Sequence, residues 1–426
     1  MIRALALGRE PARISSSVVI ALFFIALALT GYASNAIAES IPGDYRDELI
    51  QQARIARLAA EREWHLLLHY RENVLGGMKS EQDDEGFFLS PQGKVDPQAE
   101  LDATLVQFFS DAPVGRSKQP AQCAFIARYH WLKDRLSLDP DRLPPMTCER
   151  FERWRAELNP QGISLIFPSA FMNNPASMFG HTFLRIDQKG QTEQTRILAY
   201  TIDYAAQLPA DVGLEYAYKG IFGGYKGLFS APPYYLKVQG YRDIENRDMW
   251  EYQLNLTAQQ TDRLIMHAWE LGNAYFDYFF FKENCSYHIL SLLEYANPAL
   301  HLRDHFYLWT IPADTVRIVM AQPGMVGRVT YRPSRSTLIK RKREILDVEE
   351  RKVLGRLMDH PGVVQDSAFT KMSLSRRALV LDVASDFLRY KGESDDPEVK
   401  IYKERNRQIL LELSLIHISE PTRRRG

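Results

Sequence analysis

The spacing of apolar residues changes along the chain, and this change is the strongest constraint on the fold. Before Gln161, apolar residues recur at intervals of three and four, which is the period of amphipathic helices. After Gln161, short runs alternate between apolar and polar residues, as in strands that bury one face. Helical runs return between and after these strands. The pattern predicts an α+β fold in which a mostly helical region precedes a sheet-containing domain.

Two helices are predicted in the first region. Apolar residues at helical spacing among charges predict one amphipathic helix over residues 45–70. Asp96 and Pro97 supply an N-cap and a first-turn proline for a second helix.

The second region combines strands with capped helices. A Gly190-containing turn joins two alternating runs, which predicts an antiparallel hairpin. A capping-box sequence over 257–260 opens one helix, and Asn284 caps another helix that begins at Cys285. The predicted strands are residues 163–167, 181–186, 196–204, 250–256 and 275–281.

Composition places the chain among folded globular proteins. At roughly 150 residues per domain, 426 residues predict two or three domains. Hydrophobic residues make up 45% and charged residues 25%, which excludes a mainly disordered chain. Lys plus Arg (53) balances Asp plus Glu (53), so the chain lacks the basic field of nucleic-acid-binding proteins. We therefore expect no nucleic-acid partner.

The N-terminus predicts export. Three arginines precede an apolar run over 18–29, and small residues end at Ala38, which is typical of a secretory signal cleaved after that residue. An uncleaved anchor is the alternative, although the run is shorter than the roughly 20 residues that span a bilayer. We expect the mature chain to be exported and soluble.

The C-terminal part carries two separate expectations. Residues 311–412 are more basic, and the run Lys340–Arg343 is interpreted as a solvated face, with contact to anionic lipid headgroups as the alternative. Residues 413–426 look like the translation of a sequencing adapter, so we expect the natural protein to continue past Glu412.

Cysteine usage fits an oxidising compartment. Cys123 and Cys148 are predicted to form a disulfide, the alternative being two unrelated buried thiols. Cys285 would then remain free. Its place after the Asn284 cap exposes it to the N–H groups of a helix start, which favour a thiolate and can receive an oxyanion. The alternative is a buried thiol without a chemical role.

A thiol that attacks a carbonyl needs a base, and His181 at the start of a strand meets this need. The hairpin returns toward His181, so Tyr200 and Asp203 are the candidates to hold its imidazole. Asp203 is preferred because a carboxylate also stabilises the imidazolium. His288 lies one helical turn after Cys285, but a base on the same helix is poorly aimed at the sulfur.

The glycine-rich segment 219–229 resembles a phosphate loop only superficially, because it lacks the Gly-Lys-Ser/Thr ending. We predict a flexible aromatic loop over the site, with Phe222, Tyr225 and Phe229 as substrate-loop candidates; a simple connection is the alternative. No cofactor is expected. No metal is expected either, because Cys285 and nearby histidines lack a convincing further ligand.

Four blocks of sequence carry a family resemblance: 167–186, 219–230, 245–252 and 283–287. Together they resemble the Lnb N-terminal periplasmic domain over roughly residues 155–310. The preceding segment with the first two cysteines resembles one that accompanies this domain in many Gram-negative relatives. The resemblance implies a circularly permuted papain-like (NlpC-type) fold in which His precedes Cys. The Asn-Cys helix start is also similar to that of lecithin:retinol acyltransferase.

The resemblance implies a periplasmic thiol-dependent acyltransferase without a cofactor. It would move a phospholipid acyl chain through a Cys285 thioester to a lipoprotein amine, with His181 as the base and contact with a membrane surface. The third catalytic position, often Asn in relatives, is Asp203 here, and this departure leaves its role open. Asn284 and Tyr200 are the oxyanion or orienting candidates. Two other functions stay open: a cell-wall peptide amidase or cysteine peptidase, and a non-enzymatic periplasmic portion of an outer-membrane protein linked through the missing C-terminal part.

The predicted organisation has five segments. They are a signal peptide (1–38), a helical N-terminal region (39–155), the papain-like domain (156–310), a basic, partly helical extension (311–412) and the probable adapter-derived end (413–426).

Overall fold

A computed structural model describes residues 42–419 apart from 74–75, 171–177, 209–213 and 394–396. The predicted signal peptide lies outside the described residues. Within the described residues, no helix is both long enough and apolar enough to span a bilayer. The chain divides into two compact units, Met1–Leu49 and Ile50–Gly426.

The N-terminal region is mostly helical, with one small hairpin. The predicted helix over 45–70 is wrong as a single element: Arg57 adopts a left-handed conformation with φ of 53°, which ends the first helix. The second predicted helix is confirmed, and the Asp96 carboxylate accepts the N–H groups of Gln98 and Ala99. The elements are α2 (Pro42–Ile55), η1 (Leu58–Ala60), α3 (Arg62–Leu67), β1 (Tyr70–Glu72), β2 (Met78–Ser80), η2 (Glu85–Phe87), α4 (Pro97–Gln107), α5 (Ala121–Ala124), α6 (Ile126–Leu136), η3 (Pro140–Arg142) and α7 (Glu149–Leu158).

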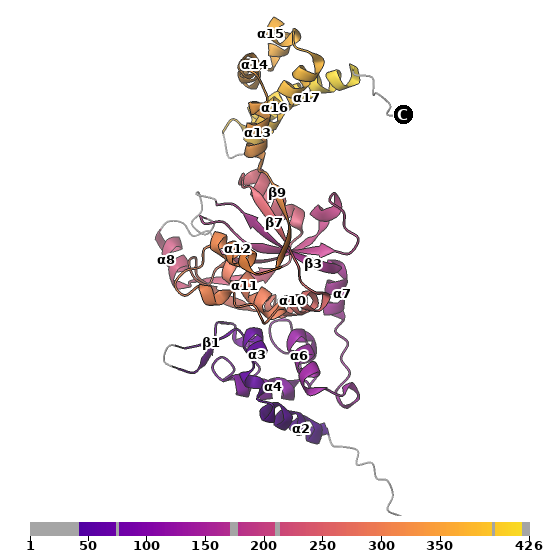
Figure 1. The fold of residues 1–426 in the computed structure, drawn as a ribbon, viewed down its shortest axis with the longest axis vertical. Coiled ribbons are helices and arrows are strands. Elements are labelled where there is room, and N and C mark those ends of the chain that lie inside the picture. The colour runs from indigo at the N-terminus through magenta and orange to yellow at the C-terminus, as the bar shows by residue number, and fades with distance from the viewer. Residues whose placement is uncertain (1–41, 74–75, 171–177, 209–213, 394–396, 420–426) are drawn as a thin grey trace, which may run out of the picture. The chain divides into compact units, whose positions relative to one another are not determined.

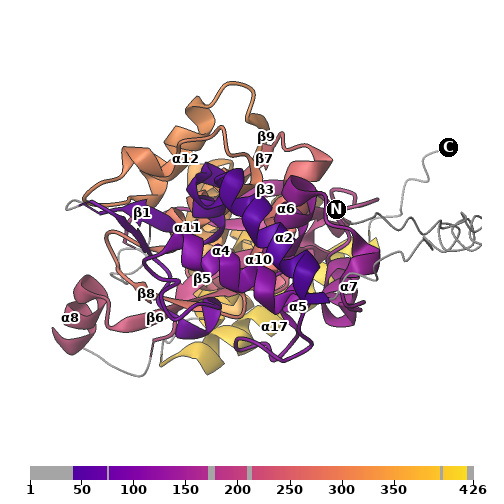
Figure 2. The same cartoon turned by 90° about the horizontal axis from the view of Figure 1, so that it is seen from below.

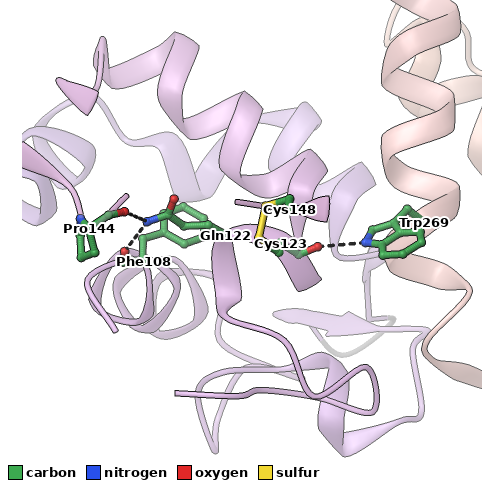
Figure 3. The surroundings of a disulfide bond; sticks show 6 residues. All are labelled: Phe108, Gln122, Cys123, Pro144, Cys148 and Trp269. Atoms are coloured by element: carbon green, nitrogen blue, oxygen red, sulfur yellow. Dashed lines mark hydrogen bonds between the residues drawn. A yellow bond between two sulfur atoms is a disulfide. The ribbon is translucent and has the colours of Figure 1, made fainter. Parts of the chain in front are cut away.

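The predicted disulfide is confirmed. Cys123 and Cys148 are bonded and close a loop with a sequence separation of 25. Figure 3 shows the Gln122 amide beside this bond, where it donates to two backbone carbonyls. On the other side, the Trp269 indole donates to the Cys123 carbonyl over 2.9 Å, which fastens the disulfide to a helix of the next region.

Seven described strands form one antiparallel sheet in the order β8-β6-β5-β4-β3-β7-β9. Each predicted strand has a counterpart, but the predicted strand 196–204 begins only at Tyr200 because Thr195–Leu198 form a 3-10 turn. The predicted hairpin is β4 paired with β5. The sequence patterns missed β6 and β9, and β9 carries the sheet past residue 310. The strands are β3 (Pro160–Pro168), β4 (Phe183–Gln188), β5 (Tyr200–Ala206), β6 (Tyr225–Ser230), β7 (Met249–Leu254), β8 (Tyr275–Tyr278) and β9 (Val326–Arg332).

Helices cover both faces of this sheet. α10 (Ala258–Leu271) and α11 (Cys285–Ala296) pack against each other and against strands β3, β4 and β5 on one face (Figures 1 and 2). The predicted capping box at the start of α10 is confirmed. On the other face, α9 (Tyr234–Val238) and the π-helical turn η6 (Gln239–Ile244) cover a small core around Phe183 and Tyr234.

The glycine-rich segment is not a flexible loop. It forms the end of α8 (Leu214–Phe222), a tight turn and strand β6. The reason is close packing: a Cβ on Gly220 would lie 2.1 Å from the Phe280 ring, and one on Gly227 would lie 1.9 Å from the Tyr204 hydroxyl. Glycine is required at both positions because two segments approach each other closely.

The C-terminal region is helical and has its own apolar core around Leu357, Val380 and Leu388. One charge of its basic run is compensated within the region, because Lys342 pairs with Asp382 and Asp386, both at 2.6 Å. The remaining elements are η5 (Thr195–Leu198), η7 (Arg303–His305), α12 (Pro312–Ala321), α13 (Arg335–Glu344), α14 (Val348–Asp359), η8 (Pro361–Gln365), α15 (Ser367–Thr370), α16 (Leu374–Gly392) and α17 (Val399–Ser419).

Candidate active site

Cys285 is the first residue of α11, and Asn284 fixes its position. The Asn284 side-chain oxygen accepts the N–H groups of Ser286 and Tyr287 at 3.1 and 3.4 Å, which confirms the predicted cap. Its amide nitrogen donates to the carbonyls of Phe280 and Thr310. Both ends of this side chain therefore hold the helix start. Because its oxygen and its nitrogen are both already hydrogen-bonded, Asn284 suits an orienting role better than donation to an oxyanion.

His181 stands just before β4 and is brought to the thiol by two features. Gly180 has a φ of 100°, and a Cβ there would lie 2.6 Å from the Phe167 ring, so only glycine permits this turn. The neighbouring Thr182 hydroxyl donates to the Ser286 hydroxyl over 2.9 Å, which joins the beginning of β4 to the beginning of α11. The imidazole and the Cys285 thiol consequently interact, and both residues are buried.

The Asp203 carboxylate contacts the His181 imidazole, and the Lys237 ammonium group contacts that carboxylate. His181 Nε2 lies 2.8 Å from Asp203 Oδ1, and Asp203 Oδ2 accepts from Lys237 Nζ at 2.5 Å. Because Nε2 is engaged by the carboxylate, Nδ1 is the ring nitrogen left for the thiol. The expectation for Tyr200 is wrong in position: it pairs with Ile186, well along the hairpin from His181.

The electrostatics favour charge separation between sulfur and imidazole. Burial lowers the pKa of His181, but the Cys285 thiolate and the Asp203 carboxylate outweigh burial and raise it to about 9. Burial raises the pKa of Cys285, but His181 and the backbone N–H of Thr182 outweigh it and lower that pKa. Burial also raises the pKa of Asp203, yet Lys237 and His181 hold it well below its usual range. Both shifts favour charge separation, with the proton on the imidazole and the negative charge on the sulfur.

Aromatic rings enclose the pair. The Tyr241 ring lies 5.8 Å from that of His181, and the Arg247 guanidinium sits 4.7 Å from the centre of the Tyr241 ring. Burial and the Cys285 thiolate raise the pKa of the Tyr278 hydroxyl well above its usual range, so this hydroxyl keeps its proton beside the sulfur. The sequence patterns missed Lys237, Tyr241 and Tyr278, since none has a motif or spacing that relates it to the thiol.

Among the neighbouring residues, the expectation for the substrate loop is corrected, and His288 is poorly aimed at the sulfur, as expected. Tyr225 and Phe229 are buried strand residues rather than parts of a mobile loop, and only Phe222 of the three substrate-loop candidates is well exposed. The His288 ring packs 4.3 Å from Tyr204 and 4.2 Å from Phe276 instead of facing the sulfur. Burial and Arg303 lower its pKa well below the usual range, so it remains neutral.

An exposed apolar surface adjoins the helix start. The Thr310 N–H donates to the Phe281 carbonyl over 2.7 Å, which places the preceding residues beside α11. The Phe280 N–H donates to the Gly220 carbonyl over 2.7 Å and holds the end of α8 at the same place. We call these exposed side chains the apolar rim: Phe179, Tyr218, Ile221, Phe222, Phe281, Tyr307, Leu308 and Trp309.

The part of the chain that the structure describes contains no cluster of three or more His, Cys, Asp or Glu side chains arranged to hold a metal ion. A thiolate at a helix start, an imidazolium and an orienting carboxylate form the constellation used for nucleophilic attack on carbonyl compounds.

The fold and this constellation define an α+β domain with a cysteine–histidine–carboxylate site. Residues 150–322 match the family model of the Lnb N-terminal periplasmic domain, which confirms the resemblance and supports a periplasmic location. Residues 56–135 and 329–424 match two domains of unknown function, DUF7843 and DUF7842. Comparison with solved structures and with curated proteins gives no match.

Proposed function

We propose that this protein is a periplasmic cysteine-dependent acyltransferase that moves an acyl chain from a phospholipid to a lipoprotein amine. The observation that carries the proposal is the buried Cys285–His181 pair, held by Asp203, in a domain of the Lnb family. The chain order of base on a strand edge, then nucleophile at a helix start, supports a circularly permuted papain-like fold.

The proposed reaction has two halves. The Cys285 thiolate attacks the ester carbonyl of a phospholipid, and His181 gives its proton to the departing lysophospholipid alcohol, which leaves a thioester. The lipoprotein amine then attacks the thioester, and His181 takes the amine proton as the amide forms and the thiolate departs. The Cys285 N–H, which the Asn284 cap does not use, and the Tyr278 hydroxyl are the proposed donors to the oxyanion.

The apolar rim supports a lipid substrate and a membrane surface as partners. Tyr307, Leu308 and Trp309 are consecutive in the chain and are 80%, 75% and 62% exposed. Large exposed apolar patches mark interaction sites. Aromatic and aliphatic side chains of this kind lie at the boundary between headgroups and acyl chains. Docking through the rim would bring the ester bond of a phospholipid to the buried thiol.

A cell-wall peptide amidase is the second candidate, and a polar cavity favours it. This cavity of about 780 Å³ is lined by Glu283 and Tyr287 from the helix start and by Arg71, Lys79 and Asp83 from the N-terminal region. Charges of both signs suit a zwitterionic peptide better than an acyl chain.

The test measures whether the Cys285 sulfur becomes acylated. Purified full-length protein is incubated with phosphatidylglycerol vesicles, and its intact mass is measured before and after a diacylated lipopeptide is added. We expect one acyl group on Cys285, its transfer to the peptide, and neither event in Cys285→Ala. Cleavage of peptidoglycan stem peptides by a protein that never gains an acyl group would replace the transferase with the amidase. An unchanged phenotype in cells carrying Cys285→Ala would instead favour the non-enzymatic role.

The rim is tested separately. Replacing Leu308 and Trp309 by Ser should reduce sedimentation with vesicles about tenfold or more, because each change removes an apolar side chain from the bilayer. Ile55→Ser is the matched control, since Ile55 is 82% exposed but lies outside the rim. Equal loss in both variants would remove the rim from the proposal.

A further inference from the structure

A groove opens between three helices of the C-terminal region, within the segment that matches DUF7842. Residues of α13, α14 and α16 line a cavity of about 270 Å³. It lies outside the segment that carries Cys285 and His181, so nothing in the proposed acyl transfer uses it.

The floor of the groove is the surface of the regional apolar core. Ile339, Leu354 and Val383 are buried members of that core, and Met358 and Phe387 pack against it while remaining partly open. An apolar ligand part lying here would cover surface that the helices leave in contact with water.

Gly355 keeps this floor open. It lies inside α14, where glycine is less stable than alanine by about 0.5–1 kcal/mol. A Cβ at this position would meet no atom within 4 Å, so close packing does not explain the glycine, unlike at Gly220 and Gly227. The consequence of the missing side chain is the space in the groove.

The edge of the groove is positively charged. Of the described residues that line it, Lys340, Arg343 and Arg351 are cations and none is an acid. Two other cations of the region are paired: Lys342 with two aspartates, and Arg356 with Asp366.

The three cations of the groove form no ion pair with a carboxylate in the part of the chain that the structure describes. The Arg351 Nε donates to a backbone carbonyl, which leaves its charge uncompensated. Three like charges around one opening repel one another, and a bound anion would offset this repulsion.

We propose that this groove binds a single-chain anionic lipid. Its carboxylate or phosphate lies among Lys340, Arg343 and Arg351, and its acyl chain covers the apolar floor. The cavity is slightly smaller than the roughly 300 Å³ at which small-molecule pockets begin, so it takes part of one chain and not two. Guanidinium groups suit both oxyanions because they donate two parallel hydrogen bonds.

Titration calorimetry on the full chain carrying Cys285→Ala tests the proposal without acyl transfer. Dodecanoate and lysophosphatidylglycerol are the two anionic probes, and whichever binds more tightly identifies the headgroup. Zwitterionic lysophosphatidylcholine should bind at least tenfold more weakly than lysophosphatidylglycerol. Inorganic phosphate alone should not bind measurably.

Two variants test the apolar floor of the groove and its charged edge separately. Gly355→Leu should weaken binding at least tenfold, because its side chain occupies the groove, while its unfolding temperature stays the same or rises. Lys340→Gln combined with Arg343→Gln should weaken binding about fivefold or more. Gly362→Leu, at another open glycine outside the groove, should bind as the parent does.

Several results would overturn the assignment. They are absence of binding by either anionic lipid, equal binding of the zwitterionic lipid, equal binding of phosphate alone, or unchanged affinity in a folded Gly355→Leu protein. Binding that Gly362→Leu weakens as much as Gly355→Leu would also refute it, since the site would then lie elsewhere.

Discussion

Replacing His181 by Ala gives the most direct test of the ion pair. In the native site, His181 is the main group that lowers the pKa of the Cys285 thiol against the effect of burial. Without the imidazolium, burial of a thiol that is only 1% exposed acts alone and raises that pKa above its ordinary value. Cys285 should then be a neutral thiol throughout the neutral range.

The size of the effect can be worked out from ionised fractions. A thiol with an ordinary pKa of about 8.5 is about 1% ionised at pH 6.5, and His181 lowers the pKa of Cys285. His181→Ala should therefore hold less thiolate than the wild type at this pH, by up to about tenfold for each pH unit that separates the two thiol pKa values. The rise in the pKa of His181 from 6.5 to about 9 corresponds to about 3 kcal/mol in favour of the imidazolium. This stabilisation is complete below pH 6.5 and is lost as the pH rises through 9.

The assay is a pH titration of thiolate absorbance in the ultraviolet, with Cys285→Ala as the blank. Absorbance does not require a reagent to reach a buried sulfur, so slow access cannot imitate a raised pKa. Wild type should gain its thiolate below about pH 8.5, and His181→Ala should gain its thiolate only above that pH. The reasoning is refuted if both proteins titrate together, or if wild type gains its thiolate only above pH 8.5. Circular dichroism establishes that the variant is folded.

Three further outcomes are expected. Asp203→Asn should reduce turnover about tenfold, less than His181→Ala does, and should move the alkaline limb of the rate profile to lower pH, because the imidazolium loses a stabilising charge but keeps a hydrogen-bond acceptor. Replacing Cys123 and Cys148 by Ala should lower the free energy of unfolding in urea by about 3 kcal/mol, as expected for a loop of this length. Arg128→Met should cost about 3–5 kcal/mol in the same assay, because it takes away the guanidinium that pairs with two fully buried carboxylates, Glu100 and Glu270. The cost should be larger at pH 8 than at pH 6, because burial raises the pKa of Glu100 to about 7 and its carboxyl group ionises across this range.

Local chemistry made much of the fold predictable. Proline at a first turn, a capping box and an Asn before an apolar run each act within a few residues, and all three predicted helix starts are present. Alternation found the strands that bury one face. It missed β9, whose residues are half-exposed or exposed along its whole length at the edge of the sheet, so no apolar alternation is required there.

The glycine-rich segment was misinterpreted because glycine occurs both in flexible loops and where two segments are in close contact, and the two cases look alike in a sequence. The segment 219–229 was expected to be mobile, yet Gly220 and Gly227 permit contact with Phe280 and Tyr204, whose positions depend on distant strands. Single-sequence patterns contain no information on such contacts. The same limit applies to Lys237, which reaches the site from α9 on the opposite face of the sheet from α11.

The presence of Lys237 accounts for a carboxylate at the third position of the site. An amide there would be neutral, but a buried Asp203 adds a negative charge next to a thiolate–imidazolium pair. That charge alone would draw the proton of His181 toward the carboxylate and leave the site with a net negative charge in a medium of low polarity. With Lys237 Nζ 2.5 Å from Asp203 Oδ2, the four charges of sulfur, imidazolium, carboxylate and ammonium balance. The carboxylate can then hold the imidazole and stabilise its charged form, while its own pKa stays low enough that it does not take the proton.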